Sequence, residues 1–75
     1  MTPYRNLSGH SNIQSYEIGD DRIIVRFASG AYRTYTYTYA SAGSHHIENM
    51  KACAIQGRGL NAYIKRNRVR YSGKS

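Results

Sequence analysis

The chain has 75 residues, of which 11 are basic and four are acidic, so it carries a net charge of +7 and forms at most one small domain. No apolar run approaches the roughly 20 residues of a membrane span, and the first residues lack the apolar stretch of a signal peptide, which predicts a cytoplasmic protein without membrane contact. Cys53 is the only cysteine, which excludes an internal disulfide framework and suits a reducing compartment.

The first half of the chain predicts three β-strands. Residues 1–11 are polar and are expected to be flexible, as chain ends usually are. The segments 12–18, 22–28 and 31–39 have the alternating patterns of strands, and the turn sequences "GDD" and "SG" separate them. Strands joined by turns this short predict an antiparallel meander.

Helical spacing replaces this alternation in the second half. From 45 to 56, apolar residues recur at the spacing of one helix face, at Ile47, Met50 and Ala54. The sequence "GRG" at 57–59 breaks that helix, and 60–67 predicts a shorter one. The predicted fold class is therefore α+β, a three-stranded antiparallel β-meander followed by a helical hairpin packed on one face. It occupies one domain, 12–68, which precedes a basic tail, 69–75.

Positive charge is concentrated near the C-terminus. Residues 1–57 carry five basic and four acidic side chains, or +1, whereas residues 58–75 carry six basic side chains and no acidic one, or +6. Such a segment attracts phosphate groups, and its mobile end is expected to follow a phosphate backbone without fixed geometry. The predicted phosphate contacts are Arg58, Lys65, Arg66, Arg68 and Arg70.

The segment "AYRTYTYTYA", 31–40, alternates Tyr and Thr, and the turn before it decides which side is hidden. With a two-residue loop at Ser29-Gly30, Phe27 lies opposite Tyr32 on the core side. The later tyrosines then share an exposed surface with three arginines, one of them Arg33, which suits the stacking of bases and the neutralisation of phosphates. That surface includes Arg22, Arg26, Tyr35, Tyr37 and Tyr39.

A three-residue loop, 28–30, shifts the pairing by one residue, so the side chains of the later tyrosines point to the core face of the sheet. We favour this loop because Ser29 fits poorly at the positive φ of a two-residue turn. A core without tyrosines would also be thin for a chain of this length. In this register Arg22, Arg26 and Tyr32 form a secondary binding surface.

Several short motifs resemble the KTSC domain, a module found at the C-terminus of some lysyl-tRNA synthetases and alone in small bacterial and phage proteins. The resemblance covers about residues 11–65 and rests on Ser11, Ile13, Phe27, Ser29-Gly30, Tyr37, Tyr39, Gly57, Leu60-Asn61 and Ile64-Lys65. The chain departs from it at Ala42-Gly43, where the family has Val-Pro, and at Gly59-Leu60, where the family has an aromatic pair. The resemblance implies an α+β fold and RNA binding, without catalytic residues.

No pattern indicates an enzyme, a metal site or a cofactor. His45 and His46 are adjacent, so on a helix their side chains point about 100° apart, and Cys53 lies about 12 Å further along the axis. Surface histidines and an unreactive thiol beside the apolar stripe are the better interpretation. The predicted function is nucleic-acid binding, with RNA favoured by the resemblance. The alternative is a protein-interaction module that docks on an acidic protein surface.

Overall fold

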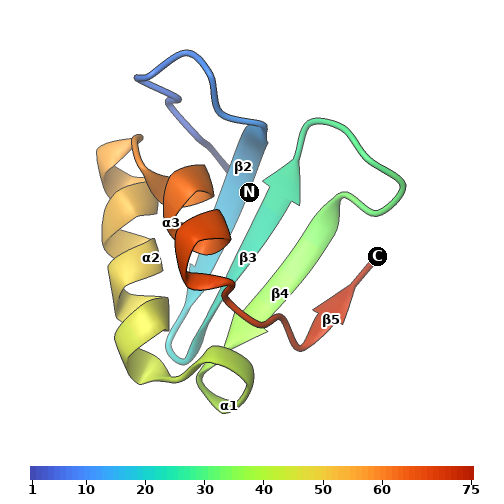
Figure 1. Ribbon diagram of the computed structural model, residues 1–75, viewed down its shortest axis with the longest axis vertical. Coiled ribbons are helices and arrows are strands. Elements are labelled where there is room, and N and C mark those ends of the chain that lie inside the picture. Colours follow the sequence, from blue (N-terminus) through green and yellow to red (C-terminus); the bar gives the residue numbers. More distant parts are fainter.

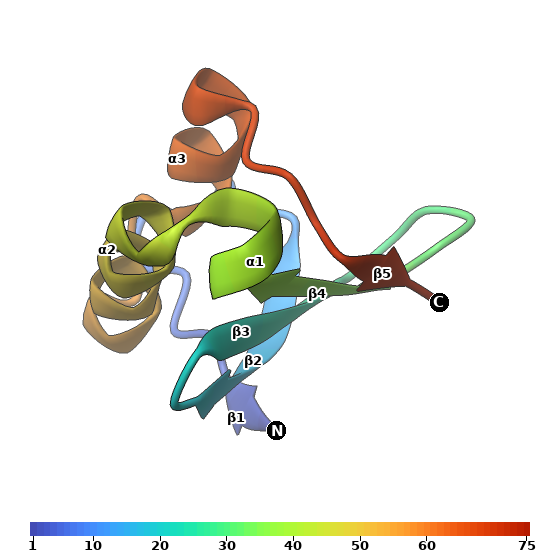
Figure 2. The same ribbon diagram turned by 90° about the horizontal axis from the view of Figure 1, so that it is seen from below.

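A computed structural model describes all 75 residues, which form an antiparallel sheet with helices on one of its faces (Figures 1 and 2). The five strands lie side by side in chain order, β1-β2-β3-β4-β5. The α+β class is confirmed. The elements are β1 (Thr2–Pro3), β2 (Ile13–Gly19), β3 (Arg22–Phe27), β4 (Thr34–Thr38), α1 (Tyr39–Ala42), α2 (Ser44–Gln56), α3 (Leu60–Asn67) and β5 (Gly73–Lys74). No helix combines the length and the apolar character needed to cross a membrane.

The sheet is larger than the predicted meander because both chain ends add a strand. Strands β2, β3 and β4 are the predicted three, and β1 pairs with β2 at one edge while β5 pairs with β4 at the other. Residues 1–11 and 69–75 were predicted as flexible segments. A two-residue strand is too short to show any periodicity, so these pairings left no pattern in the sequence.

The C-terminal residues are held at the sheet edge. The side chain of Val69 is buried in the core, and the Ser72 N–H donates to the carbonyl of Thr36 at 2.7 Å. Ser75 and Thr34 exchange two backbone hydrogen bonds, of 2.8 and 3.0 Å. The description of 69–75 as a mobile tail is therefore corrected: the segment satisfies the edge of β4 that the meander would leave open.

Pairing between β3 and β4 fixes the faces of the tyrosines. Ile23 lies opposite Tyr37 and Val25 opposite Tyr35. The Phe27 N–H donates to the carbonyl of Arg33 at 2.7 Å, so these two residues face each other and the loop between them spans 28–32, which is longer than either predicted loop. It has the same parity as the three-residue loop, so both tyrosines lie on the core side and the two-residue register is wrong.

Tyr39 does not belong to β4, although the predicted strand 31–39 includes it. Helix α1 begins at Tyr39 and is capped by Thr38. The Thr38 hydroxyl accepts from the Ser41 N–H, and the Thr38 N–H donates to the Ser41 hydroxyl at 3.1 Å. Tyr39 was predicted to be a core residue in the favoured register, but 38% of it is exposed. The capping pair ends the strand one residue before the alternation of Tyr and Thr does.

The core lies between the sheet and the helices. Ile47, Met50 and Ala54 of α2 are buried as predicted, together with Ile23 and Val25 of β3. Helix α2 ends at Gly57, whose φ of 77° is in the left-handed region. Helices α2 and α3 lie to one side of the sheet, so that β5 and the loop 28–32 extend beyond them (Figure 2). The helix side of β4 and β5 therefore remains partly open.

Candidate nucleic-acid interface

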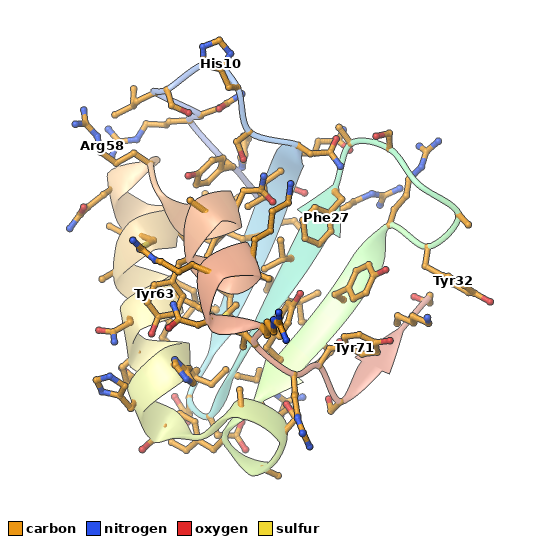
Figure 3. All side chains as sticks on the ribbon, viewed as in Figure 1. His10, Phe27, Tyr32, Arg58, Tyr63 and Tyr71 are labelled. Atoms are coloured by element: carbon orange, nitrogen blue, oxygen red, sulfur yellow. The ribbon has the colours of Figure 1, made fainter.

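Aromatic rings gather on the helix side of the sheet, next to α3. The ring of Tyr35 meets those of Phe27 and Tyr71 edge to face, with centroids 5.3 and 5.0 Å apart. It stacks on the ring of Tyr37 at 6.4 Å, and Tyr71 completes the group at 6.5 Å from Tyr37. We call these four residues the aromatic cluster. Figure 3 shows Phe27, Tyr32 and Tyr71 on the side of α3 that faces away from α2.

The aromatic cluster runs from the core to the surface. Tyr37 is only 2% exposed, Phe27 and Tyr35 are half-buried, and 43% of Tyr71 is exposed. Burial, followed by the nearby hydroxyls of Tyr35 and Tyr71, raises the pKa of Tyr37 to about 12. The Tyr37 hydroxyl is therefore protonated at neutral pH and available as a hydrogen-bond donor. The cluster offers an apolar floor with polar tips.

A groove of about 590 Å³ lies between the end of α3, β4 and the segment 68–71 that leads to β5. Its apolar lining consists of Tyr37, Ile64, Val69 and Tyr71, and its basic lining of Lys65, Arg68 and Arg70. We call it the α3 groove. A smaller hollow of about 290 Å³, beside the loop 28–32, shares Tyr37 with the groove and is also lined by Phe27, Tyr32 and Tyr35. The two hollows therefore adjoin at the aromatic cluster.

Arg68 occupies an unusual backbone position at the edge of the α3 groove. It ends α3 with φ 48° and ψ 50°, in the left-handed region, where glycine is the usual residue. The Val69 N–H donates back to the carbonyl of Ile64 at 3.2 Å, which closes the helix and turns the chain toward the sheet. An arginine here keeps a strained backbone while its side chain lines the groove.

The basic residues of the α3 groove have no carboxylate partner. The protein has two ion pairs, Asp21 with Arg22 at 3.3 Å and Glu48 with Lys51 at 2.9 Å, and neither involves the groove. Lys74 adds a further cation at the sheet edge. Its ammonium lies 4.6 Å from the ring centre of Tyr32, and the Tyr71 hydroxyl raises its pKa. The aromatic cluster is thus bordered by positive charge that no acidic side chain offsets.

Only some of the residues that the sequence predicts for nucleic-acid binding lie at the α3 groove and the adjoining hollow. Lys65, Arg68 and Arg70 come together with Tyr37 around the α3 groove, and Tyr32 lies at the adjoining hollow. Arg66 is exposed on α3 but does not line the groove. Arg58 lies in the turn between α2 and α3, on the opposite side of the molecule from Tyr71 (Figure 3).

Three further predicted residues lie elsewhere. Arg22 and Arg26 pair with Thr38 and Thr34, alternating with the core residues of β3, so they lie on the sheet face without helices. They cannot contact the same short ligand segment as the α3 groove. The Tyr39 hydroxyl donates to Glu48 at 2.6 Å, which raises the pKa of Tyr39 and lowers that of Glu48.

Sequence reasoning missed Tyr71 and Phe27 as site residues. It placed Tyr35 on a binding surface only with the two-residue loop, and it counted Lys74 in the basic segment without naming it among the predicted phosphate contacts. One signal was present: Val69 and Tyr71 stand two residues apart within the basic segment, as on one face of a strand. The density of charge in that segment obscured this short alternation.

The histidines and the cysteine do not gather around a common point. No group of three His, Cys, Asp or Glu side chains is close enough to hold a metal ion. Cys53 is half-buried beside α3, and burial raises the pKa of its thiol, against a smaller opposite effect of Arg66.

Comparison of the chain with protein-family models, with curated proteins and with solved structures gives no match. The resemblance to the KTSC domain therefore stays a prediction.

Proposed function

We propose that the protein binds single-stranded nucleic acid along the α3 groove and the aromatic cluster. The observation that carries this proposal is the placement of Lys65, Arg68 and Arg70, none of them paired with a carboxylate, along one groove with the partly exposed ring of Tyr71. Unpaired bases stack on aromatic rings while cations neutralise the phosphates that link them. A groove with both features in contact suits this ligand.

A single strand fits this arrangement better than a duplex. The rings of the aromatic cluster offer faces and edges to a base, but the bases of a duplex are already stacked on each other. The preference for RNA over DNA rests on the KTSC resemblance, and the cytoplasm as its location rests on the lone cysteine. Arg22 and Arg26 would act at most as a second, weaker surface on the other side of the sheet.

Binding of fluorescent oligonucleotides, followed by polarisation at several salt concentrations, tests the proposal. We would replace Lys65, Arg68 and Arg70 together by Gln, and in a matched control Arg22, Arg26 and Arg58, which removes the same charge elsewhere. If each groove residue meets one phosphate, the plot of log K against log salt becomes shallower by about 2 for the groove variant. The control should keep most of the slope. Equal weakening by both variants would show that general positive charge, and no particular groove, attracts the nucleic acid.

An acidic protein surface is the alternative partner, because the same unpaired cations would also attract carboxylates. Binding to a random RNA pool, compared with capture from a nuclease-treated lysate, separates the two. Retention of a protein partner after nuclease treatment, with no binding to the RNA pool, would favour the alternative.

A further inference from the structure

A small basic pocket adjoins the α3 groove on the other side of Arg68 and Arg70. It measures about 200 Å³, and its polar lining is Ser41, His46, Asn67, Arg68 and Arg70. Both arginines also line the α3 groove. A strand in that groove would therefore pass the mouth of this pocket, which we call the His46 pocket.

Two polar side chains of the His46 pocket are already engaged in the fold. The Ser41 hydroxyl donates to the backbone carbonyl of Arg70 at 2.9 Å. The side-chain amide of Asn67 donates to the backbone carbonyl of Tyr63 at 3.0 Å. The two guanidinium groups make no ion pair, and no acidic residue lines the pocket. The charged or titratable groups left to meet a ligand are thus the two arginines and the imidazole of His46, beside the second N–H and the oxygen of the Asn67 amide.

A hydrogen-bond chain orients the imidazole of His46. The Asn49 amide donates to the Tyr63 hydroxyl at 3.1 Å, and that hydroxyl lies 2.7 Å from Nδ1 of His46. The Tyr63 oxygen can accept two hydrogen bonds and donate one, so this contact occupies Nδ1 of His46 whichever of the two atoms carries the proton. Figure 3 shows Tyr63 on α3, between that helix and α2. The chain leaves Nε2 as the ring nitrogen of His46 without a partner in the fold, and Nε2 donates to a ligand whenever it carries a proton.

We infer that the His46 pocket binds the terminal phosphate monoester of a nucleic-acid strand, which rests on the proposed function. Two guanidiniums and one N–H donor match a group with three unsubstituted oxygens and close to two negative charges. An internal phosphodiester has only two such oxygens, and its chain must continue on both sides. At about 200 Å³ the pocket is also smaller than the sites that hold whole small molecules, so a base does not fit with the phosphate.

The test compares three single-stranded oligonucleotides of one sequence: with a 5′-phosphate, with a 3′-phosphate, and with hydroxyl ends but two extra nucleotides. A terminal monoester carries close to two negative charges and an internal phosphate carries one, so the third strand has about the same total charge and a general effect of charge cancels. We expect one of the phosphorylated strands to bind about tenfold more tightly than the third, since charge-assisted hydrogen bonds are worth this much. Equal binding of all three strands would refute the His46 pocket while leaving the proposed function intact. Failure of all three to bind would refute both.

Two variants locate the effect. His46→Phe keeps a ring beside Tyr63 but removes the donor, and it should reduce the preference for the phosphorylated end at least threefold. His45→Phe is the matched control, because His45 is the exposed neighbour on α2 and does not line the pocket. The NMR signals of the His46 ring should shift on addition of the preferred phosphorylated strand. Inorganic phosphate alone should shift them only at much higher concentration, which separates a strand end from a free anion. A preference that survives in His46→Phe, or a ring that does not respond, would overturn the assignment.

Discussion

Replacing Arg68 by Gly should stabilise the protein while weakening its binding to nucleic acid. Arg68 has φ 48° and ψ 50°, a conformation that costs a residue with a side chain about 1–2 kcal/mol and costs glycine little. Glycine loses more backbone entropy on folding, by about 0.5–1 kcal/mol, which offsets part of this gain. Arg68 is exposed and forms no ion pair, so little else is lost.

The net gain in the free energy of unfolding is therefore about 0.5–1 kcal/mol. In a domain of this size it should raise the melting temperature by about 3–6 °C, which calorimetry or thermal circular dichroism can measure. The matched control is Arg66→Gly. Arg66 is exposed within α3, where glycine costs up to about 1 kcal/mol, so the melting temperature should fall.

Binding measurements complete the test. Loss of one phosphate contact should make the plot of log K against log salt shallower by about 0.7 in Arg68→Gly. Arg68→Ala should show the same loss of binding without the gain in stability, because alanine keeps the strained backbone. A lower melting temperature for Arg68→Gly would refute the argument from strain. Higher stability with unchanged binding would show that the arginine is not kept for a ligand.

Three further predictions concern the fold. Tyr37→Ala should lower the free energy of unfolding by about 3 kcal/mol in urea denaturation, as truncation of a buried ring does, whereas an unchanged midpoint would contradict the core position of Tyr37. Folding raises the pKa of the Tyr37 hydroxyl from 10.0 to about 12, so the unfolded chain releases this proton at lower pH than the folded protein does. The free energy of unfolding should therefore fall as the pH rises from 10.0 to about 12. Tyr37→Phe has no such proton, and its free energy of unfolding should fall less over the same pH range. Gly57→Ala should lower the free energy of unfolding by about 1–2 kcal/mol, because φ is positive there and a Cβ would lie 2.7 Å from that of Arg5. Gly73→Ala, with no atom within 4 Å of its Cβ, is the control, and equal losses would refute the argument.

Features that follow from neighbouring residues were predictable. Period-two patterns located β2 and β3, and the spacing of Ile47, Met50 and Ala54 located α2 and its buried face. Loop chemistry at Ser29-Gly30 gave the correct side for Tyr35 and Tyr37, although the loop is longer than predicted, because only its parity decides the face. The basic groups of the groove were identified from charge alone.

Contacts between distant parts of the chain were not predictable. The pairing of Gly73 and Lys74 with β4 places Tyr71 beside Tyr35, and no local pattern in the last residues specifies that partner. For the same reason, strand alternation grouped Tyr32 with Arg22 and Arg26 on a secondary surface. Tyr32 instead lines the hollow beside the aromatic cluster, whereas the two arginines lie on the opposite face of the sheet.

Local patterns and long-range contacts differ in predictability for a physical reason. Periodicity records which side of an element avoids water, a property that each residue shares with neighbours three or four positions away in a helix and two in a strand. It therefore determined β2, β3 and α2 and their buried faces, but not β1, α1 or β5. Whether a short edge strand forms depends on unpaired backbone groups of another strand, which the sequence of that edge does not encode. The site lies where such an edge meets the end of α3, so only the tertiary structure could join its aromatic and basic halves.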